Sequence, residues 1–301
     1  AIALIEIKES GKLTQGTIKF MATVGEEMEQ SGSQQLFEKG YADDLDALLI
    51  AEPSFPSLVY AHKGSMDFRI KSKGRASHSS LPFLGQNAIK PLLEFIQNIN
   101  QEYEKITQSV KGESLDFSNM INNLGSQLPN HITKEKAQEL IQGLVMTNSI
   151  VQGGTQVNSV PDFATAEFNV RTIPEYNNNK VKALFNEYIE QANQNGASLT
   201  QELYLDLEPV VTTGQNRLVE LGFDIAKSHF SNERDLIVTP TVAVTDASNL
   251  LKGKDENFPF LMFGPGNGPH QINECVEKAN YLEFVEYYIE FITSYLNEEN
   301  E

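Results

Sequence analysis

Short apolar runs alternate with amphipathic segments in the first part of the chain. The run at residues 16–24 is rich in β-branched side chains and leads into Gly25-Glu26-Glu27, which predicts a buried strand. A helix is expected over residues 33–40, and a second apolar run over residues 47–51 predicts a strand that ends at Glu52. A strand, a helix and a strand within ~40 residues are typical of the βαβ unit of a mostly parallel sheet.

The middle of the chain has a different order of elements. Its hydrophobic pattern predicts β-α-β-β-α-β, which is the ferredoxin-like unit. Both helices carry an apolar stripe at helical spacing, and we interpret these stripes as core. The strands are expected at residues 66–72, 149–152 with 158–160, 164–172 and 198–205, and the helices at residues 87–106 and 181–192.

The βα pattern returns after Gly214. The simplest division is a discontinuous α/β catalytic domain, residues 1–62 and 207–301, interrupted by an inserted ferredoxin-like α+β domain, residues 63–206. The catalytic domain is predicted to have a mostly parallel sheet with helices on both faces. A polar stretch at residues 109–146, with a short helix near its end, receives no functional interpretation. The C-terminal elements are expected as helices at 216–229, 247–251 and 281–296 and strands at 236–244 and 258–263.

Charge and cysteine content exclude several classes of protein. The 41 Asp and Glu residues against 23 Lys and Arg residues give a formal net charge of −18, which repels phosphate backbones and anionic membranes. With Cys275 as its one cysteine, the chain has no intramolecular disulfide and no thiolate-rich metal site. The sequence has no apolar run of ~18 residues and no leader pattern. We therefore expect a cytoplasmic protein that binds neither nucleic acid nor membranes.

Carboxylates gather where the first two predicted strands end. Glu26 and Glu27 are adjacent, so they repel one another unless a cation lies between them or one of them is protonated. The alternative is a Glu pair that opens a helix and is stabilised by the helix dipole. Glu52 follows the second strand, and neighbouring parallel strands bring their carboxyl ends to one edge of a sheet. Three carboxylates at one edge favour a metal site.

Two other strand ends and one turn carry side chains that could take part in chemistry. His270 lies in a Gly/Pro-rich loop after an apolar strand, where it is either a metal ligand or a surface residue. Thr245 and Asp246 similarly follow another strand, where they are either part of the site or the N-cap of the next helix, and we favour the N-cap. His78 is surrounded by hydroxyl residues at a strand-to-helix turn, where it either caps the turn or donates an N–H to an oxyanion.

Five strings, in this order, give the chain a specific resemblance. They are GEE at residues 25–27, Ala-Glu52-Pro, GRASHSSLPFLGQNAI, GGTQVNSVPDFATAEFNVRTIP and FGPGNGPHQINE. The chain resembles the acetylornithine deacetylase/succinyl-diaminopimelate desuccinylase family of dinuclear zinc amidohydrolases and peptidases over essentially its whole length. The resemblance implies a metal-dependent hydrolase that cleaves the amide bond of an N-acyl amino acid or a dipeptide. It also implies two divalent metal ions, zinc first and cobalt or manganese as alternatives, and a homodimer through the inserted domain.

The resemblance assigns roles to individual positions. Glu26 matches the general base, which takes a proton from metal-activated water. Glu27 and Glu52 match ligands of different metals, and His270 matches the partner of Glu27. His78 matches a residue that reaches across a dimer to hold the oxyanion in the neighbouring subunit's active site.

Two more positions match, and one part of the family pattern is not found. Asn158 and Arg171 match positions that hold the substrate's carboxylate, which an Arg fork suits geometrically. The family's His-x-Asp strand end and its metal-bridging Asp lie upstream of the helix that residues 1–9 resemble, and neither occurs here. We therefore expect further residues upstream of Ala1 in the natural protein, and weak or no metal binding and negligible hydrolysis by this chain.

Two readings from other classes stay open. The chain could be a non-catalytic dimeric scaffold or binding homologue, in which case substitution of Glu26 changes no activity. It could also be an aminopeptidase with a related two-metal sheet; such enzymes lack the domain that carries His78, so dimer-dependent activity separates the two cases. The sequence does not distinguish acetylornithine, succinyl-diaminopimelate, acylated amino acids and dipeptides as substrates.

Overall fold

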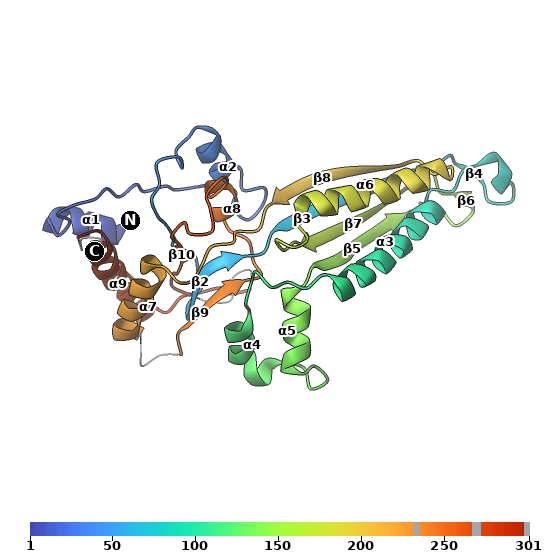
Figure 1. Cartoon of the computed structure of the whole chain (residues 1–301). Helices are drawn as coiled ribbons and strands as arrows, with labels where there is room; N and C mark the ends of the chain where they lie inside the picture. The colour runs from blue at the N-terminus through green and yellow to red at the C-terminus, as the bar shows by residue number, and fades with distance from the viewer. Residues whose placement is uncertain (231–234, 267–271, 298–301) are drawn as a thin grey trace.

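The chain folds into two parts, each built on its own β-sheet (Figure 1). The computed structural model describes residues 1–230, 235–266 and 272–297. Among these residues, no helix is both long and apolar enough to span a bilayer.

The first sheet is mixed and mostly parallel. Its strands are β1 (Leu48–Ile50), β10 (Phe260–Met262), β2 (Ser57–His62) and β9 (Ile237–Thr241), in the order β1-β10-β2-β9. β1 pairs with β10 and β2 pairs with β9 in parallel, whereas β10 and β2 meet in antiparallel register at Met262 and Val59. The predicted strand at 258–263 therefore becomes the neighbour of the strand that leads to Glu52.

Helices cover both faces of this sheet, as predicted. Because successive strand residues point to opposite faces, Leu261 packs with the helices α7 (Arg217–Phe230) and α9 (Lys278–Asn297). Phe260 and Met262 pack on the other face, where α8 (Ala247–Leu250) lies against α2 (Ser31–Glu38). The N-terminal helix α1 (Ile2–Ser10) packs against α9.

The strand predicted at residues 16–24 is not formed. This segment is extended, but it pairs with no strand among the described residues and has no strand assignment. Phe20 and Val24 are 63% and 72% exposed, so the run is not buried either. A β-branched apolar run becomes a strand only when a neighbouring strand satisfies its backbone groups, and the local pattern does not supply that neighbour.

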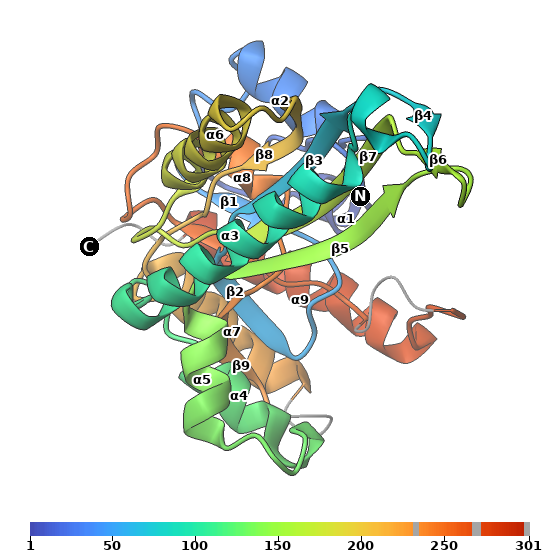
Figure 2. The same ribbon diagram turned by 90° about the vertical axis from the view of Figure 1, so that its right-hand side faces the viewer.

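The second sheet confirms the ferredoxin-like prediction. Its strands are β3 (Ser65–Lys73), β5 (Val145–Gly153), β7 (Phe163–Arg171) and β8 (Leu199–Leu207), all antiparallel in the order β5-β7-β3-β8. The helices α3 (Ile89–Ser109) and α6 (Asn178–Gln194) lie on one face of it (Figure 2). Their core includes Phe68 stacked on Phe185 with ring centroids 4.2 Å apart. The short strands β4 (Ser77–His78) and β6 (Ser159–Val160) and the turn η1 (Pro82–Leu84) form its far tip.

The junction between the two parts is tightly packed around residues 62–64. A side chain at Gly64 would place its Cβ 2.2 Å from Thr172 Oγ1 and 2.6 Å from the Leu207 carbonyl, so only glycine fits where these segments cross. His62 Nδ1 donates to the Lys63 carbonyl at 2.7 Å, which leaves Nε2 to accept from Thr245 Oγ1 at 3.3 Å. Burial of His62 lowers its pKa to about 4, so the ring is neutral at pH 7.

The polar stretch at 109–146 forms a small helical unit beside the junction (Figure 1). The predicted helix near its end is α5 (Lys134–Gln142), and η2 (Gly125–Gln127) and a further helix, α4 (Ser118–Leu124), precede it. Asn119 Nδ2 donates to the Val238 carbonyl on the edge strand β9 at 2.8 Å. Leu115 and Phe117 are buried in a cluster with Ala61 of β2. This unit therefore ties the inserted domain to the first sheet.

We expect Phe117→Ala to destabilise the chain by about 3–5 kcal/mol, because it empties a buried site that joins the two parts. Urea unfolding measures this loss. The matched control is Phe83→Ala at the far tip, where the side chain is 76% exposed and the change should stay within about 0.5 kcal/mol. Equal effects of the two substitutions would contradict the role assigned to the helical unit.

Candidate active site

The Gly25-Glu26-Glu27 segment is a compact turn held by its own backbone. The amides of Met28 and Gln30 both donate to the Gly25 carbonyl, at 3.2 and 2.9 Å. Gly25 and Gln30 both have left-handed backbone conformations, with φ of 72° and 50°. Because Gln30 is not a glycine, this conformation carries a cost that the surrounding contacts must offset.

Buried amide side chains anchor this turn to α8. Gln30 is 1% exposed, and its Nε2 donates to Glu26 Oε1 at 3.0 Å. Asn249 of α8 is also buried and donates from Nδ2 to Ser33 Oγ at 3.1 Å and to the Gln30 carbonyl at 3.5 Å. The Glu26 carboxylate is therefore held through Gln30 by a helix more than 200 residues later in the chain.

Glu52 lies at the end of β1, next to the segment that follows β10. A Cβ added at Gly264 would lie 2.5 Å from the Glu52 carbonyl, which shows how closely the two segments approach. Burial, and after it the carboxylates of Glu26, Asp246 and Glu27, raise the pKa of Glu52 to about 8. These four acidic side chains, from three separate segments, therefore lie within electrostatic reach of one another.

Asp246 is the member of this group for which the sequence favoured a role as an N-cap. It occupies the N-cap position of α8, but its side chain makes no capping bond; Thr245 Oγ1 accepts from the Ala247 amide instead, at 3.1 Å. Asp246 Oδ2 accepts a 2.5 Å hydrogen bond from Thr23 Oγ1, and its buried Oδ1 has no partner. Asp246 therefore lies at the predicted N-cap position, but the side chain that bonds the first turn is that of Thr245.

The donor set has the charge and the oxygen atoms that suit a divalent cation. Mutual repulsion of the acids and an orphaned carboxylate oxygen are both relieved when a cation binds. Within the described ranges, however, no three His, Cys, Asp or Glu side chains lie close enough to hold a metal ion together. His270, the predicted partner of Glu27, lies outside the described residues.

The other three predicted site residues lie on the inserted domain. His78 is exposed at the tip, where its Nδ1 is 2.8 Å from Ser80 Oγ. Asn158 is beside it, because its carbonyl accepts from the Ser79 amide at 3.0 Å. Arg171 is at the junction, where Thr172 pairs with Gly64, and its Nε donates to Asn169 Oδ1 at 3.1 Å.

A single chain therefore does not bring Asn158 and Arg171 together. β7 separates them, and its span from residue 163 to residue 171 is about 26 Å at the usual rise of an extended strand. Burial lowers the pKa of Arg171, partly offset by Asp67, but an Arg stays protonated throughout the physiological range. One substrate can meet both side chains only if Asn158 comes from a second copy.

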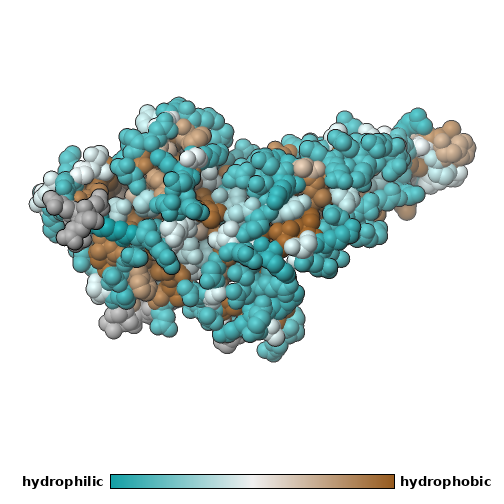
Figure 3. Space-filling view, in the orientation of Figure 1, coloured by the Kyte–Doolittle hydropathy of each residue, from teal (hydrophilic) through white to brown (hydrophobic). Residues whose placement is uncertain are grey.

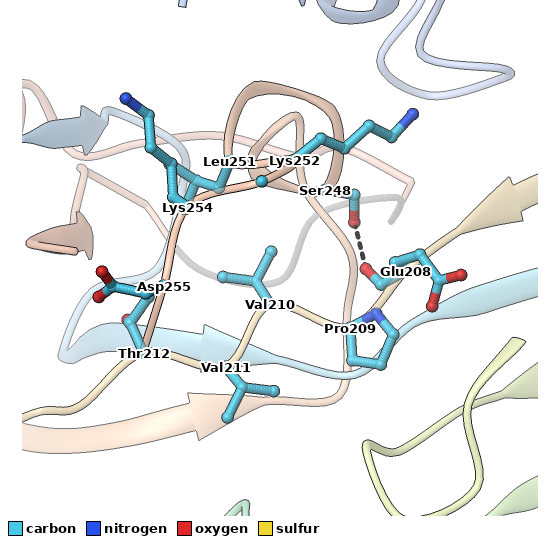
Figure 4. Close-up of a pocket in the computed structure, with 11 residues that line it drawn as sticks. Glu208, Pro209, Val210, Val211, Thr212, Ser248, Leu251, Lys252, Lys254 and Asp255 are labelled. Carbon is cyan, nitrogen blue, oxygen red and sulfur yellow. Dashed lines mark hydrogen bonds between the residues drawn. The ribbon is translucent and has the colours of Figure 1, made fainter. Parts of the chain in front are cut away.

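A pocket of about 260 Å³ lies beside α8, and none of these residues lines it (Figure 4). Pro209, Val210 and Thr212 line one wall of it, and Leu251 and Lys254 line the other. Ser248 Oγ donates to the Glu208 carbonyl across it at 2.9 Å. This hydrogen bond joins α8 to the segment after β8, and the pocket is distinct from the acidic group.

Two contributions to the site were not predicted from the sequence. Gln30 and Asn249 are ordinary polar residues in the sequence, and no local pattern marks them as partners. Asp246 did have a signal, since an acidic residue directly after an apolar strand has the same placement as Glu26 and Glu52.

Comparison with known proteins places the chain in a family. Residues 60–197 match the family described as the peptidase dimerisation domain. Over 299 residues the chain is 40% identical to a probable succinyl-diaminopimelate desuccinylase of Staphylococcus aureus (strain MRSA252), covering 99% of this chain and 72% of that protein. An M20 family metallo-carboxypeptidase from Sulfolobus solfataricus aligns with a TM-score of 0.72 at 19% identity, over 97% of this chain and 73% of the other. A dinuclear metal-binding M20 peptidase from Bacillus subtilis aligns with a TM-score of 0.59 at 16% identity, over 98% and 69%.

The fold, with a ferredoxin-like domain inserted into an α/β domain, is that of proteins that carry a peptidase dimerisation domain. The sequence identity narrows the class: the chain belongs to the M20 peptidase family. This confirms the resemblance found in the sequence and the predicted fold class.

In the metal-free chain we expect the contribution of the Glu52 carboxyl to stability to fall as the pH rises from about 5 to 9. The folded chain holds the Glu52 proton with a pKa of about 8, against an ordinary value of 4.5. The stabilisation from that proton is complete below pH 4.5 and is lost as the pH rises through 8. After allowance for partial exposure the change is on the order of 2–4 kcal/mol.

Urea unfolding of the chain in EDTA, repeated from pH 5 to pH 9, measures this dependence. The stability of Glu52→Gln relative to the parent chain should increase as the pH rises, because the amide is never charged. The matched control is Glu38→Gln on the exposed end of α2, which should leave the curve parallel to that of the parent chain. A curve for Glu52→Gln that runs parallel to the curve of the parent chain would contradict the raised pKa of Glu52 in the acidic group.

Proposed function

We propose that this protein is a metal-dependent hydrolase that cleaves the amide bond of an N-acyl amino acid or a dipeptide. Membership of the M20 family supports hydrolysis, and the 40% identity to a probable succinyl-diaminopimelate desuccinylase favours an N-succinyl or N-acetyl amino acid as substrate. We also propose the domain division derived above, with residues 1–62 and 207–301 carrying the metals and residues 63–206 forming the dimerisation and lid domain.

The observation that carries this proposal is the convergence of Glu26, Glu27 and Glu52. They come from two segments of the chain, yet Glu26 and Glu27 both act on the pKa of Glu52. A protein that used this region only for packing would gain by replacing such mutually repelling acids. A bound cation would offset the repulsion between these carboxylates, and zinc, cobalt and manganese all accept carboxylate ligands.

Each residue has a distinct task in the proposed reaction. Glu27 with His270 would hold one metal ion and Glu52 would contribute to the other. The two ions, when bound, would activate a water molecule and polarise the scissile carbonyl. Glu26 would take the proton from the attacking water and return it to the leaving amine. The Gln30 amide, which donates to Glu26 Oε1, fixes the direction in which that carboxylate accepts the proton.

A second copy of the chain would complete the site. β4, which carries His78, lies at the far end of the inserted domain from α2 and α8, so His78 does not reach its own chain's acidic group (Figure 1). Around it the tip is apolar, and a hydrophobic patch is visible there (Figure 3); its exposed members are Leu81, Phe83 and Leu84. We propose that His78 and Asn158 enter the partner's site, where Arg171 would bind the substrate's carboxylate.

The inserted domain offers a surface for such a homodimer. β5 is an edge strand of the second sheet, and Ile150 and Val151 on it are 41% and 50% exposed. An exposed apolar edge strand is a ready template for pairing with another chain.

In a protein that also carries the upstream residues found in its relatives, Glu26→Gln should lower kcat by about 10²–10⁴-fold with little change in KM, because it removes the base without removing a ligand. Hydrolysis of N-succinyl-diaminopimelate, N-acetylornithine, other N-acyl amino acids and dipeptides, each with added zinc, cobalt or manganese, provides the assay. The control is Glu29→Gln in the same turn, which is exposed and outside the acidic group. Full activity of Glu26→Gln on a substrate that the parent protein hydrolyses would refute the assignment.

Mixed dimers test the contribution of the second copy. Glu26→Gln and His78→Ala proteins should each be inactive, because one lacks the base and the other lacks the donor to the oxyanion. After subunit exchange, random mixing should restore about a quarter of the parent activity, since each heterodimer has one intact composite site. If His78 acted within its own chain, exchange would restore nothing.

A further inference from the structure

An unpaired carboxylate oxygen lies at the edge of the candidate metal centre. Asp246 is 6% exposed, and its Oδ1 is buried without a hydrogen-bond partner. Its other oxygen, Oδ2, is already engaged by Thr23 Oγ1 at 2.5 Å. An ionised carboxylate that is buried and only half satisfied is destabilising unless something else binds the free oxygen.

The neighbours of Asp246 increase this cost. Its carboxylate and those of Glu26 and Glu27 all act on Glu52, so Asp246 adds a fourth acidic side chain to the group. A structural cap would face the amides of α8, but Thr245 caps that helix and the Asp246 side chain makes no capping bond. Capping of α8 therefore does not account for the charge on Asp246.

The bond to Thr23 gives the carboxylate a fixed direction. Thr23 is two residues before Gly25, so the bond ties the start of α8 to the turn that carries the proposed general base. Within the described part of the chain, Asp246 does not form a metal-binding group with two other acids or histidines. A role one hydrogen bond away from the ion fits this placement better than direct ligation.

We propose that Asp246 is a positioning residue of the metal centre. Its unpaired Oδ1 accepts a hydrogen bond from an N–H or O–H donor in the ligand shell of a bound divalent cation. The inference rests on the proposed function, because it assigns Asp246 to the same centre as Glu27 and Glu52. In this role the negative charge is unfavourable in the metal-free protein and favourable once the cation is present.

The opposite signs of these two effects provide the test. In the metal-free 301-residue chain, Asp246→Asn should raise the melting temperature by about 2–4 °C, because it removes a buried charge while its side-chain oxygen still accepts from Thr23. In the complete protein, the same substitution should weaken Zn²⁺ binding, measured by isothermal titration calorimetry, by about 10–100-fold. The matched control is Asp224→Asn, an exposed residue of α7 paired with Lys227, which should change neither quantity appreciably.

Each outcome separates the inference from the proposed function. Glu52→Gln serves as the reference, because it removes a proposed ligand and should weaken Zn²⁺ binding in every case. If Glu52→Gln binds Zn²⁺ more weakly and Asp246→Asn binds it as the parent does, the role of Asp246 is overturned. The proposed metal centre is not affected by that result. A fall in the metal-free melting temperature of Asp246→Asn would also overturn it, since that is the result of an ordinary structural hydrogen bond. If the parent protein and Glu52→Gln bind Zn²⁺ equally, the proposed function itself fails.

Discussion

Electrostatic repulsion within one acidic group is the constraint on which this structure depends. Glu26, Glu27, Glu52 and Asp246 are gathered from three segments although their charges oppose it. The opposing stabilisation comes from the two apolar faces of the first sheet, where α7 and α9 pack on one side and α8 and α2 on the other. A rigid sheet can hold groups in an arrangement that they would not adopt alone, which is how a fold prepares a site for a cation.

Buried polar contacts convert this packing into a defined site. Asn249, Gln30 and Glu26 form a chain of hydrogen bonds from α8 to the proposed general base. Thr245 links α8 to His62 at the junction with the inserted domain. The segment from Thr245 to Asn249 therefore contacts the acidic group, the turn that carries Glu26 and the junction.

The inserted domain has two ends with different roles. Its base is fixed to the first sheet by Gly64 and by the helical unit that contains Phe117. Its tip extends away from its own acidic group and carries His78 among exposed apolar side chains. In a family described by its dimerisation domain, this shape favours a site shared between two chains. In the homodimer proposed above, rigidity at the base would control the alignment of the tip.

The sequence by itself determined the ferredoxin-like order, the helices that cover both sheets and the position of Glu52 at the end of a strand, because local periodicity and strand-end placement encode them. The strand predicted at residues 16–24 is not formed, because a strand needs a partner strand. The sequence did not predict α4, because that helix is stabilised by its packing on β9. Only the tertiary structure decided that Asp246 joins the acidic group, that Gln30 holds Glu26, and that Asn158 and Arg171 lie at opposite ends of one strand. These relations join residues far apart in the chain, and no local pattern records which distant side chains will meet.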